Sequence, residues 1–579
     1  MYKARNRNIF YLLTIIVIIV GVANFNTLRF DLTAEKRFTL SDATIGLLQR
    51  VKQPIKITVF LTGNLPADYK KLATATENLL SDFKRYNQQN IQFEFKYPSN
   101  NLNDSLQYKL YDSLAKMGVV FERNEQLDDA NNKQPFIIPC AIVESKTAQP
   151  LVVDLRSSKK VFKAYNVVTD IPEEDIEATR NAAESLLEYK FINAIDKLTR
   201  EYVPTVAYLV GNGQPINLTV NDMGESLRNQ YRLGIFNLQS NYPKASEIDA
   251  LLIVKPTIPF SDEDKLKIDQ YLMQGGKIVW CIDKLYAEMD SLQRSQADLI
   301  AYDRGLNIDD QLFKYGVRIN NNLLQDLNCA KVPIVTGYNP DNSPKIQRMP
   351  WPYYPFATSA NANAITKNID RVLTIFPSGI DTIAVANVKK TVLLATDTNS
   401  KIISTPALIT LNTIKSEDDF LQFNKSHIPI AVLLEGMFSS LYANRLSKVV
   451  MDSVEKRTGI PFASTSSNNA KQIVISDADI ITNSVSNTTG PMQMGMLPLE
   501  NYKFANKDFF LNSMDYLVSN SAIFNTRNKQ FTLRILDKEK IASQQLFWQL
   551  LNIILPIAFV ILLGATLIWL RKKKYTSIN

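Results

Sequence analysis

Two long apolar runs frame the 579-residue chain, and shorter apolar runs alternate with amphipathic segments between them. Residues 9–25 and 546–570 are almost wholly apolar and carry no charge. A transmembrane helix needs about 20 consecutive apolar residues. The pattern therefore predicts one membrane-spanning helix within residues 1–28 and a second within residues 541–579.

Basic residues lie at the outer end of each apolar run. Lys3, Arg5 and Arg7 precede the first run, and residues 571–574 (RKKK) follow the second. Because positive residues favour the cytoplasmic side, we expect both termini in the cytoplasm and the bulk of the chain outside it. A signal peptide cleaved near residues 21–23 is the alternative for the first run, although the apolar core of such a peptide spans only about 7–15 residues.

The second apolar run contains Gln549, Asn552 and Pro556. Proline is tolerated in a membrane helix where neighbouring groups satisfy the freed backbone, and polar side chains there bond to other helices. These residues favour a kinked helix that packs on another membrane protein. A simple anchor is the alternative.

Residues 29–200 alternate between strand-like and helix-like patterns that contain the order β-α-β-α-β-β-α. The strands are expected at 55–61, 91–98, 118–123, 136–145 and 151–156, and the helices at 66–88, 103–117 and about 172–200. This order predicts a thioredoxin-like domain. The position of the redox site, after the first strand at residues 62–65, holds no cysteine, and a thiolate is the nucleophile of that chemistry.

Residues 201–540 predict a second α/β domain with insertions. Apolar strands at 206–210, 250–256 and 277–283 are separated by helical segments. Ser261 precedes one of these helices as a cap, and a glycine pair ends it. Alternating strands and helices indicate a parallel, doubly wound sheet of the flavodoxin-like kind.

Charge and cysteine content narrow the function. The net charge is +8, but removing the seven basic residues of the two tips leaves 58 basic and 57 acidic residues. A nucleic-acid-binding protein needs a basic surface on its folded body, so we expect no nucleic-acid partner. The three cysteines (Cys140, Cys281 and Cys329) have no metal-ligand spacing. Three buried thiols are expected, with one disulfide as the alternative.

A glycine turn follows the strand at 206–210 and reads Gly211-Asn212-Gly213-Gln214. Ligands of open α/β sheets collect just past strand carboxyl ends, so Asn212 and Gln214 are candidate crevice residues. The turn lacks the third glycine of a dinucleotide site and the Gly-Lys-Ser/Thr of a P-loop. We expect a tight turn rather than a nucleotide site.

Three carboxylates also follow predicted strands: Asp283, Asp477 and Asp479. Such groups can bind Ca²⁺ or transfer protons, whereas Asp residues after a strand are more often turn and cap residues. The single histidine, His427, lies at the entry to an apolar strand, and no GxSxG frame is present. Neither hydrolytic catalysis nor a resident metal or cofactor is expected.

Residues 347–358 (QRMPWPYYPFAT) predict a rigid loop because prolines alternate with aromatic residues. Trp351, Tyr353, Tyr354 and Phe356 in such a loop suit contact with a protein or glycan. The alternative is that the rings cap a hydrophobic core.

Long strings of this sequence resemble the GldG family of Bacteroidetes, the gliding-motility-associated auxiliary components of ABC transporters. The resemblance runs nearly end to end and includes DLTAEKRFTLSDATIGLL, FSDEDKLKIDQYLMQGGKIVWCID, MPWPYYPF, IAVLLEGMFSSLYANRL and VISDADIITN. It implies a two-pass protein of the bacterial inner membrane with a periplasmic body. It also implies an ABC permease subunit, a cytoplasmic ATPase subunit and other gliding-machinery proteins as partners.

The resemblance further implies that the second domain is amidotransferase-like but without catalysis. In relatives the glycine turn tends to read Gly-His-Gly-Glu, whereas Asn212 and Gln214 are neutral here. We therefore predict a non-catalytic subunit that couples the transporter to periplasmic partners. The alternatives are a ligand-binding receptor for sugars or peptides, with a cleft near Gln214, Asp283 and residues 347–358, and a carboxylate- or metal-dependent enzyme.

Overall fold

The structure is a computed structural model in which the chain divides into two compact units, Met1–Gln530 and Phe531–Asn579. The N-terminal apolar run lies outside the described residues. The described residues are 31, 39–98, 104–123, 136–162, 174–289, 298–411, 417–467, 470–486, 488, 490–498, 502–519, 521–529 and 538–576.

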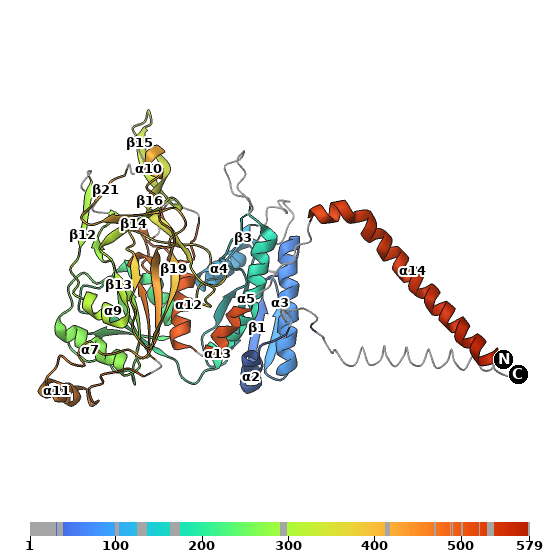
Figure 1. The fold of residues 1–579 in the computed structure, drawn as a ribbon, viewed down its shortest axis with the longest axis horizontal. Helices are drawn as coiled ribbons and strands as arrows, with labels where there is room; N and C mark the ends of the chain where they lie inside the picture. The colour runs from blue at the N-terminus through green and yellow to red at the C-terminus, as the bar shows by residue number, and fades with distance from the viewer. Residues whose placement is uncertain are drawn as a thin grey trace. The chain divides into compact units, whose positions relative to one another are not determined.

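The first lobe of the larger unit, within residues 39–200, is built on a four-stranded sheet in the order β2-β1-β5-β6 (Figure 1). Strand β1 is parallel to β2 and antiparallel to β5. The elements of this lobe are α2 (Asp42–Arg50), β1 (Ile55–Val59), α3 (Ala67–Tyr86), β2 (Ile91–Phe95), α4 (Asp104–Lys116), β3 (Glu122–Arg123), β4 (Phe136–Ile137), β5 (Cys140–Ser145), β6 (Leu151–Asp154) and α5 (Ile176–Thr199).

The strand expected at 136–145 is divided into β4 and β5. Pro139 lies between the two parts, and proline has no N–H to donate to a sheet ladder. The strand expected at 118–123 is likewise reduced to the two residues of β3. Thioredoxin-like remains a prediction for this lobe.

The second lobe, within residues 203–529, contains a ten-stranded sheet in the order β15-β16-β19-β22-β23-β10-β9-β7-β8, with β17 paired to β16. Strands β23, β10, β9, β7 and β8 are mutually parallel, and β22 pairs with β23 in the antiparallel sense. The sheet strands are β7 (Thr205–Val210), β8 (Arg232–Asn237), β9 (Ala250–Val254), β10 (Lys277–Cys281), β15 (Cys329–Tyr338), β16 (Pro344–Ser359), β17 (Val372–Leu373), β19 (Val388–Ala395), β22 (Pro429–Gly436) and β23 (Lys471–Ile475).

Shorter pieces complete this lobe. Four small β-sheets have the strand orders β11-β12-β21, β13-β18, β14-β20 and β24-β25. The helices and remaining strands are η2 (Leu218–Val220), α6 (Asn221–Arg228), α7 (Asp262–Met273), β11 (Leu285–Tyr286), β12 (Leu299–Asp303), α9 (Asp309–Tyr315), β13 (Val317–Ile319), β14 (Asn322–Asp326), β18 (Ile380–Thr382), β20 (Ser400–Ser404), β21 (Ala407–Ile409), α10 (Glu417–Phe420), α11 (Lys448–Thr458), η3 (Ala478–Ile480), β24 (Val485–Ser486), β25 (Gly490–Pro491), α12 (Asn506–Val518), α13 (Ser521–Phe524) and η4 (Asn525–Asn528).

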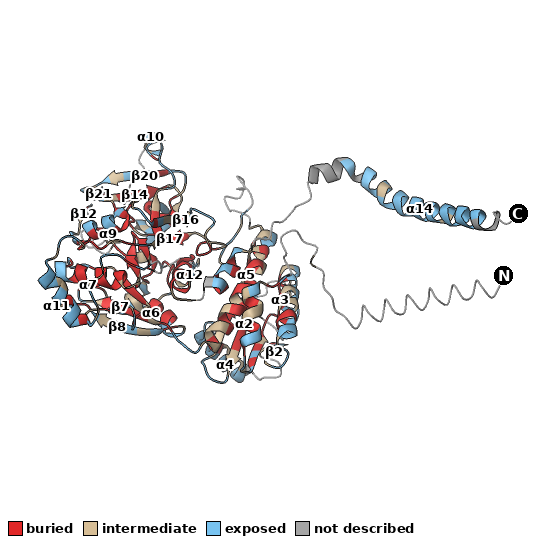
Figure 2. Ribbon diagram, turned by 60° about the horizontal axis from the view of Figure 1, so that its bottom comes forward, coloured by how far each residue is buried: buried red, intermediate tan, exposed pale blue. Residues whose placement is uncertain are grey.

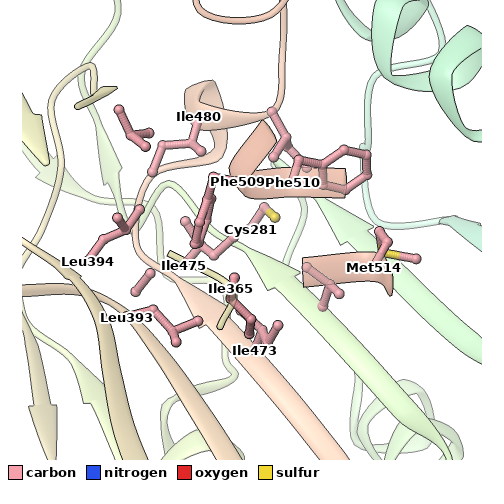
Figure 3. Close-up of a cluster of buried hydrophobic side chains, with 14 of the residues drawn as sticks. Cys281, Ile365, Leu393, Leu394, Ile473, Ile475, Ile480, Phe509, Phe510 and Met514 are labelled. Carbon is pink, nitrogen blue, oxygen red and sulfur yellow. The ribbon is translucent and has the colours of Figure 1, made fainter. Parts of the chain in front are cut away.

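The central strands are buried on both faces, which explains their continuous apolar runs (Figure 2). Side chains of β9 alternate between two hydrophobic clusters, because successive residues of a strand point to opposite faces. Helices α6 and α12 contribute to one cluster, and α7 and α9 contribute to the other. In Figure 3, Cys281 of β10 lies in the first cluster with Ile473 and Ile475 of β23 and Phe509 of α12.

Helix α7 begins and ends as its sequence predicts. Ser261 accepts a hydrogen bond from the backbone N–H of Asp264, whose carboxylate accepts one from the Ser261 N–H in return. Gly275, with φ of 90°, lies just past the helix, and its N–H bonds to the Leu272 carbonyl. The predicted cap at each end is confirmed.

The smaller unit contains helix α14 (Lys538–Thr576), which continues through Pro556. Its segment Leu546–Lys573 is the one helix among the described residues that is long and apolar enough to cross a membrane. None of that segment is buried against other parts of the structure. The domain boundary expected between residues 540 and 541 falls inside this helix.

Candidate functional site

A cluster of charged side chains lies at the carboxyl edge of the parallel strands. Lys255 directly follows β9, Asp283 lies two residues beyond β10, and Asp477 lies two residues beyond β23. The three strands are neighbours in the sheet, so their ends bring these side chains together. Asp479, in η3, completes the cluster.

Lys255 is the centre of the cluster. Its Nζ lies 2.7 Å from Oδ1 and 2.9 Å from Oδ2 of Asp479, and 3.1 Å from Oδ2 of Asp283. The other oxygen of Asp283 accepts the Ala478 N–H at 2.7 Å. The Thr482 hydroxyl donates to Asp479 at 2.7 Å. The ammonium thus joins two carboxylates that come from different strands.

Asp477 has a different role, because it is wholly buried and its oxygens bond to the backbone. Its Oδ2 accepts the Ile375 N–H at 2.6 Å, and its Oδ1 accepts the Asp479 N–H at 2.9 Å. These two hydrogen bonds therefore link the segment that follows β17 to the turn that follows β23. The interpretation of Asp477 as a turn and cap residue agrees with this geometry.

Burial and neighbouring charges shift the pKa values of the cluster. Burial raises the pKa of the Asp477 carboxyl well above its ordinary value, and the nearby Asp479 and Asp283 carboxylates add to the rise. Burial also raises the pKa of Asp283, although the Lys255 ammonium acts in the opposite direction. For Lys255, burial lowers the pKa, but Asp283 and Asp479 outweigh it and keep the amine charged.

The three carboxylates could be read as a cation site, since one oxygen from each lies within 4.8 Å of the others. The Lys255 ammonium, however, stands among them at hydrogen-bond distance from two. A divalent cation binds oxygen ligands at about 2.0–2.6 Å and would have to displace this amine. The arrangement is an internal ion-pair network, and the residues present do not fit a metal.

The glycine turn lies at the same edge of the sheet, after β7. Gly211 and Gly213 have φ of 124° and 77°, a region open mainly to glycine. The Asn212 carbonyl accepts the N–H groups of Thr257 and Ile258, each at 3.0 Å. The turn is therefore held against the loop that follows β9.

Asn212 and Gln214 are both buried, with 1% and 7% of their surface exposed. The Asn212 amide donates to Asp264 at 3.2 Å, and its backbone N–H donates to Gln214 Oε1 at 2.8 Å. Oδ1 of Asn212 and Nε2 of Gln214 have no hydrogen-bond partner among the described residues. Among the described residues, no hydrogen bond or ion pair joins these amides to Asp283 or Asp477. The amides of the glycine turn and the carboxylates of the Lys255 cluster thus lie at the same end of the parallel strands, but they belong to separate hydrogen-bond networks.

Replacing Gly213 by alanine is expected to lower the free energy of unfolding by about 1–3 kcal/mol. A Cβ at this position would lie 2.1 Å from Thr257 Oγ1 and 3.3 Å from the Ile258 nitrogen, in addition to the strain of its positive φ. The matched control is Gly234→Ala in β8, where a Cβ meets nothing within 4 Å. Urea unfolding should separate the two variants, and equal stability would refute the tight-turn interpretation.

The predicted aromatic loop is wrong, because residues 344–359 form strand β16. Trp351, Tyr353, Tyr354 and Phe356 are at most 5% exposed and share a core with Phe376. The Trp351 Nε1–H donates to the Thr410 carbonyl at 3.1 Å, and the Tyr353 hydroxyl donates to the Leu408 carbonyl at 3.0 Å. The rings therefore face inward beneath the β12–β21 ladder, as the alternative interpretation expects.

The remaining predicted residues have simpler surroundings. Gln549, Asn552 and Pro556 are exposed on α14. His427 is exposed, has φ of 52° and lies just before β22. All three cysteines are free thiols, as expected, but Cys329 is only partly buried. Burial raises the pKa of Cys281 well above its ordinary value and that of Cys329 to about 12, so both are poor nucleophiles.

Sequence reasoning missed Lys255. It follows the apolar run of β9 directly and has an unusual φ of 45°. The signal was its place at the end of a buried strand, the same signal that identified Asp283 and Asp477.

The described residues combine a mixed α/β body with one helix that is long and apolar enough to cross a membrane. A family model described as "ABC-type uncharacterized transport system" matches residues 203–513, more than half of the chain. The chain belongs to this family, which associates it with an ABC transport system. A model of a domain of unknown function (DUF7088) matches residues 34–144.

No curated protein matches the chain. Among solved structures, the mmIFT52 N-terminal domain is 11% identical, with 55% of this chain and 98% of that chain covered and a TM-score of 0.31. The exo-beta-1,4-mannosidase Op5Man5 from Opitutaceae bacterium strain TAV5 is 9% identical, with 51% and 35% covered and a TM-score of 0.19. Both TM-scores are low, so neither likeness assigns a fold or an activity.

Proposed function

We propose that the chain is a non-catalytic, membrane-anchored subunit of an ABC-transporter-type complex. Its two termini lie in the cytoplasm and its folded body in the periplasm. The observation that carries the proposal is the family match over residues 203–513, in a chain that also contains the apolar helix α14. The basic residues at both tips support the orientation.

The chemistry of the sheet edge supports a subunit without catalysis. Lys255 is paired with both Asp283 and Asp479, while Asn212 and Gln214 cannot titrate. The sequence contains no P-loop, so energy for transport comes from an ATPase partner. The body presents binding surfaces, and the anchors pass movement between the permease and periplasmic partners.

Three finer parts of the proposal rest on narrower support. Gliding motility as the process rests on the resemblance to the gliding-associated family. A thioredoxin-like first lobe is supported by the order β2-β1-β5-β6, with β1 parallel to β2 and antiparallel to β5. The amidotransferase-like name for the second lobe rests on the resemblance alone.

Helix α14 is the element that should hold the partner permease. Gln549 and Asn552 are three residues apart and therefore lie on the same face of the helix. Each polar side chain between membrane helices contributes about 0.6–2 kcal/mol. The variant Gln549→Leu/Asn552→Leu should therefore weaken association with the complex by roughly tenfold. Affinity purification of the tagged protein from detergent-solubilised membranes, with quantification of ABC permease and ATPase subunits, measures the effect.

Thr566→Val is the matched control within the same helix. The Thr566 hydroxyl already donates to the Leu562 carbonyl at 2.7 Å, so its loss should leave co-purification unchanged. If wild-type protein recovers no permease or ATPase, the subunit role is wrong. If the double leucine variant recovers as much as the wild type, α14 is a simple anchor.

A further inference from the structure

A cavity of about 230 Å³ lies between the two lobes of the larger unit, away from the Lys255 cluster. Helix α5 of the first lobe lines it with Lys190, Asn193 and Lys197, which recur at helical spacing. Helix α12 of the second lobe lines it with Asn512 and Asp515. A single water needs only about 10–15 Å³ by the same kind of measure, so the cavity has room for a small ligand.

The acidic groups of the wall are largely engaged by other cations. Asp515 pairs with Lys197 at 2.8 Å. The Asp154 carboxylate accepts hydrogen bonds from Nε of Arg156 at 3.1 Å and from Nη2 of the same side chain at 2.8 Å. Asp508, the third acidic residue of the wall, is exposed.

Two further cations of the wall have no carboxylate within ion-pair distance among the described residues. The Lys190 ammonium donates to the Asp154 carbonyl at 2.7 Å and to the Arg156 carbonyl, which leaves one of its three hydrogens unused. Arg527, only 3% exposed, donates to the Ala364 carbonyl at 2.8 Å and to the Lys367 carbonyl at 3.0 Å.

The Arg527 guanidinium lies close enough to Lys190 and Lys367 to repel both ammonium groups. Burial lowers the pKa of Lys190 and outweighs the Asp154 and Asp508 carboxylates, which act to raise it, and the Arg527 charge lowers it further. Burial and the same Arg527 charge lower the pKa of the neighbouring Lys367 to about 8. Gathering buried positive charges costs free energy unless an opposite charge compensates them. An anion in the cavity would supply that compensation.

We propose that this inter-lobe cavity binds a small oxyanion, a carboxylate or a phosphate, between Lys190 of the first lobe and Arg527 of the second. Asn512 adds an amide N–H from the second lobe, because its Nδ2 donates one hydrogen to the Ile365 carbonyl at 3.0 Å and carries a second. Because the anion bonds to both lobes, its binding also stabilises the interface between them. The inference does not depend on association with a transporter.

The test uses full-length protein in detergent, with sodium phosphate and sodium succinate as two separate probes and sodium chloride at equal ionic strength as the baseline. One probe should raise the thermal unfolding midpoint in a saturable way beyond the chloride baseline, because a ligand of the folded state stabilises it. Which probe acts distinguishes a phosphate site from a carboxylate site. In Lys190→Gln the same probe should bind about tenfold more weakly, as expected for loss of one charge-assisted hydrogen bond.

Lys52→Gln is the control, because Lys52 is an exposed lysine of the first lobe, and it should respond like the wild type. Hydrogen exchange of the wild-type protein provides a readout that does not depend on any variant. The probe should slow exchange in residues 186–197 and 508–515 but not in residues 250–258. If neither probe exceeds chloride in midpoint or protection, or if Lys190→Gln responds like the wild type, the anion site is refuted.

Discussion

Replacing Lys255 by methionine should lower the free energy of unfolding by about 3–5 kcal/mol, the usual cost of removing one partner of a buried ion pair. The side chains of Lys255, Asp283 and Asp479 are 20%, 11% and 17% exposed, so the lower end of that range is expected. Methionine fills a similar space but leaves two carboxylates facing each other. Urea unfolding followed through buried Trp280 and Trp351 measures the loss.

The loss in Lys255→Met should depend on pH. Without the ammonium, the pKa of Asp283, which burial already raises, should rise further above that of the unfolded chain. A carboxyl whose folded pKa is raised destabilises the fold as pH climbs through the unfolded value of about 4. The deficit should therefore be larger at pH 7–8 than at pH 4–5.

A second variant separates charge from packing. Lys255→Met/Asp479→Asn removes one of the two facing carboxylates and should recover part of the lost stability. Lys389→Met, at an exposed position of β19, should change stability by less than about 0.5 kcal/mol. A Lys255→Met protein as stable as the wild type at pH 7 would show that the cluster is not an internal ion-pair network.

The sequence was enough to predict that Asp283 and Asp477 lie at strand ends, because the apolar pattern of a buried strand is a local property of the chain. The apolar runs that precede Asp283 and Asp477 are too continuous for half-exposed strands, and parallel strands end at one edge of a sheet. Lys255 follows the apolar run of β9 in the same way, but nothing local shows which groups it meets. Its partners, Asp283 and Asp479, follow two other strands of the chain. The crossover connections place β9, β10 and β23 side by side in the sheet, and this brings the three side chains together.

The aromatic strand shows how a local rule fails. Proline cannot donate to a sheet ladder, so Pro350, Pro352 and Pro355 argue for a loop. In the structure, the ladder between β15 and β16 shifts register in this stretch, from Pro350 opposite Lys331 to Pro355 opposite Cys329. The prolines are tolerated where regular pairing is interrupted, and burial of the rings, a tertiary effect, outweighs the local preference.

The cavity between α5 and α12 was invisible in the sequence for a related reason. In each helix sequence, the polar residues that line the cavity look no different from those of a solvated face. Only the docking of the two lobes buries Tyr189, Asn193 and Lys197 against a helix more than 300 residues away. The charge balance of that interface is therefore a property of the folded chain.

Asp515 is the residue on which this docking depends. Its Oδ2 accepts hydrogen bonds from Tyr189 and Asn193 of α5, each at 3.0 Å, and its Oδ1 lies 2.8 Å from Nζ of Lys197. The Tyr231 hydroxyl, from the second lobe, also donates to it. Burial acts to raise the pKa of Asp515, but the Lys197 ammonium and these hydrogen bonds hold it below its ordinary value.

Asp515→Asn should therefore cost about 3–5 kcal/mol at pH 7, because the Lys197 side chain, 7% exposed, loses its counter-charge. Since the folded pKa is lowered, the ionised carboxyl stabilises the fold above the unfolded value of about 4, and that contribution is lost as pH falls through the folded pKa. The gap between wild type and variant should close below pH 4. Urea midpoints from pH 3 to 7 measure the gap.

Two comparisons make the result specific to the interface between the lobes. Asp452→Asn, at an exposed position of α11, should leave the midpoint unchanged across the range. Lys197→Met/Asp515→Leu replaces the buried pair by apolar side chains and should be more stable than Asp515→Asn, because no uncompensated charge remains. Hydrogen exchange in Asp515→Asn should rise first in residues 189–199 and 509–518. Uniform loss of protection across both lobes would instead mean that they unfold as one unit, with no separate docking step at α5 and α12.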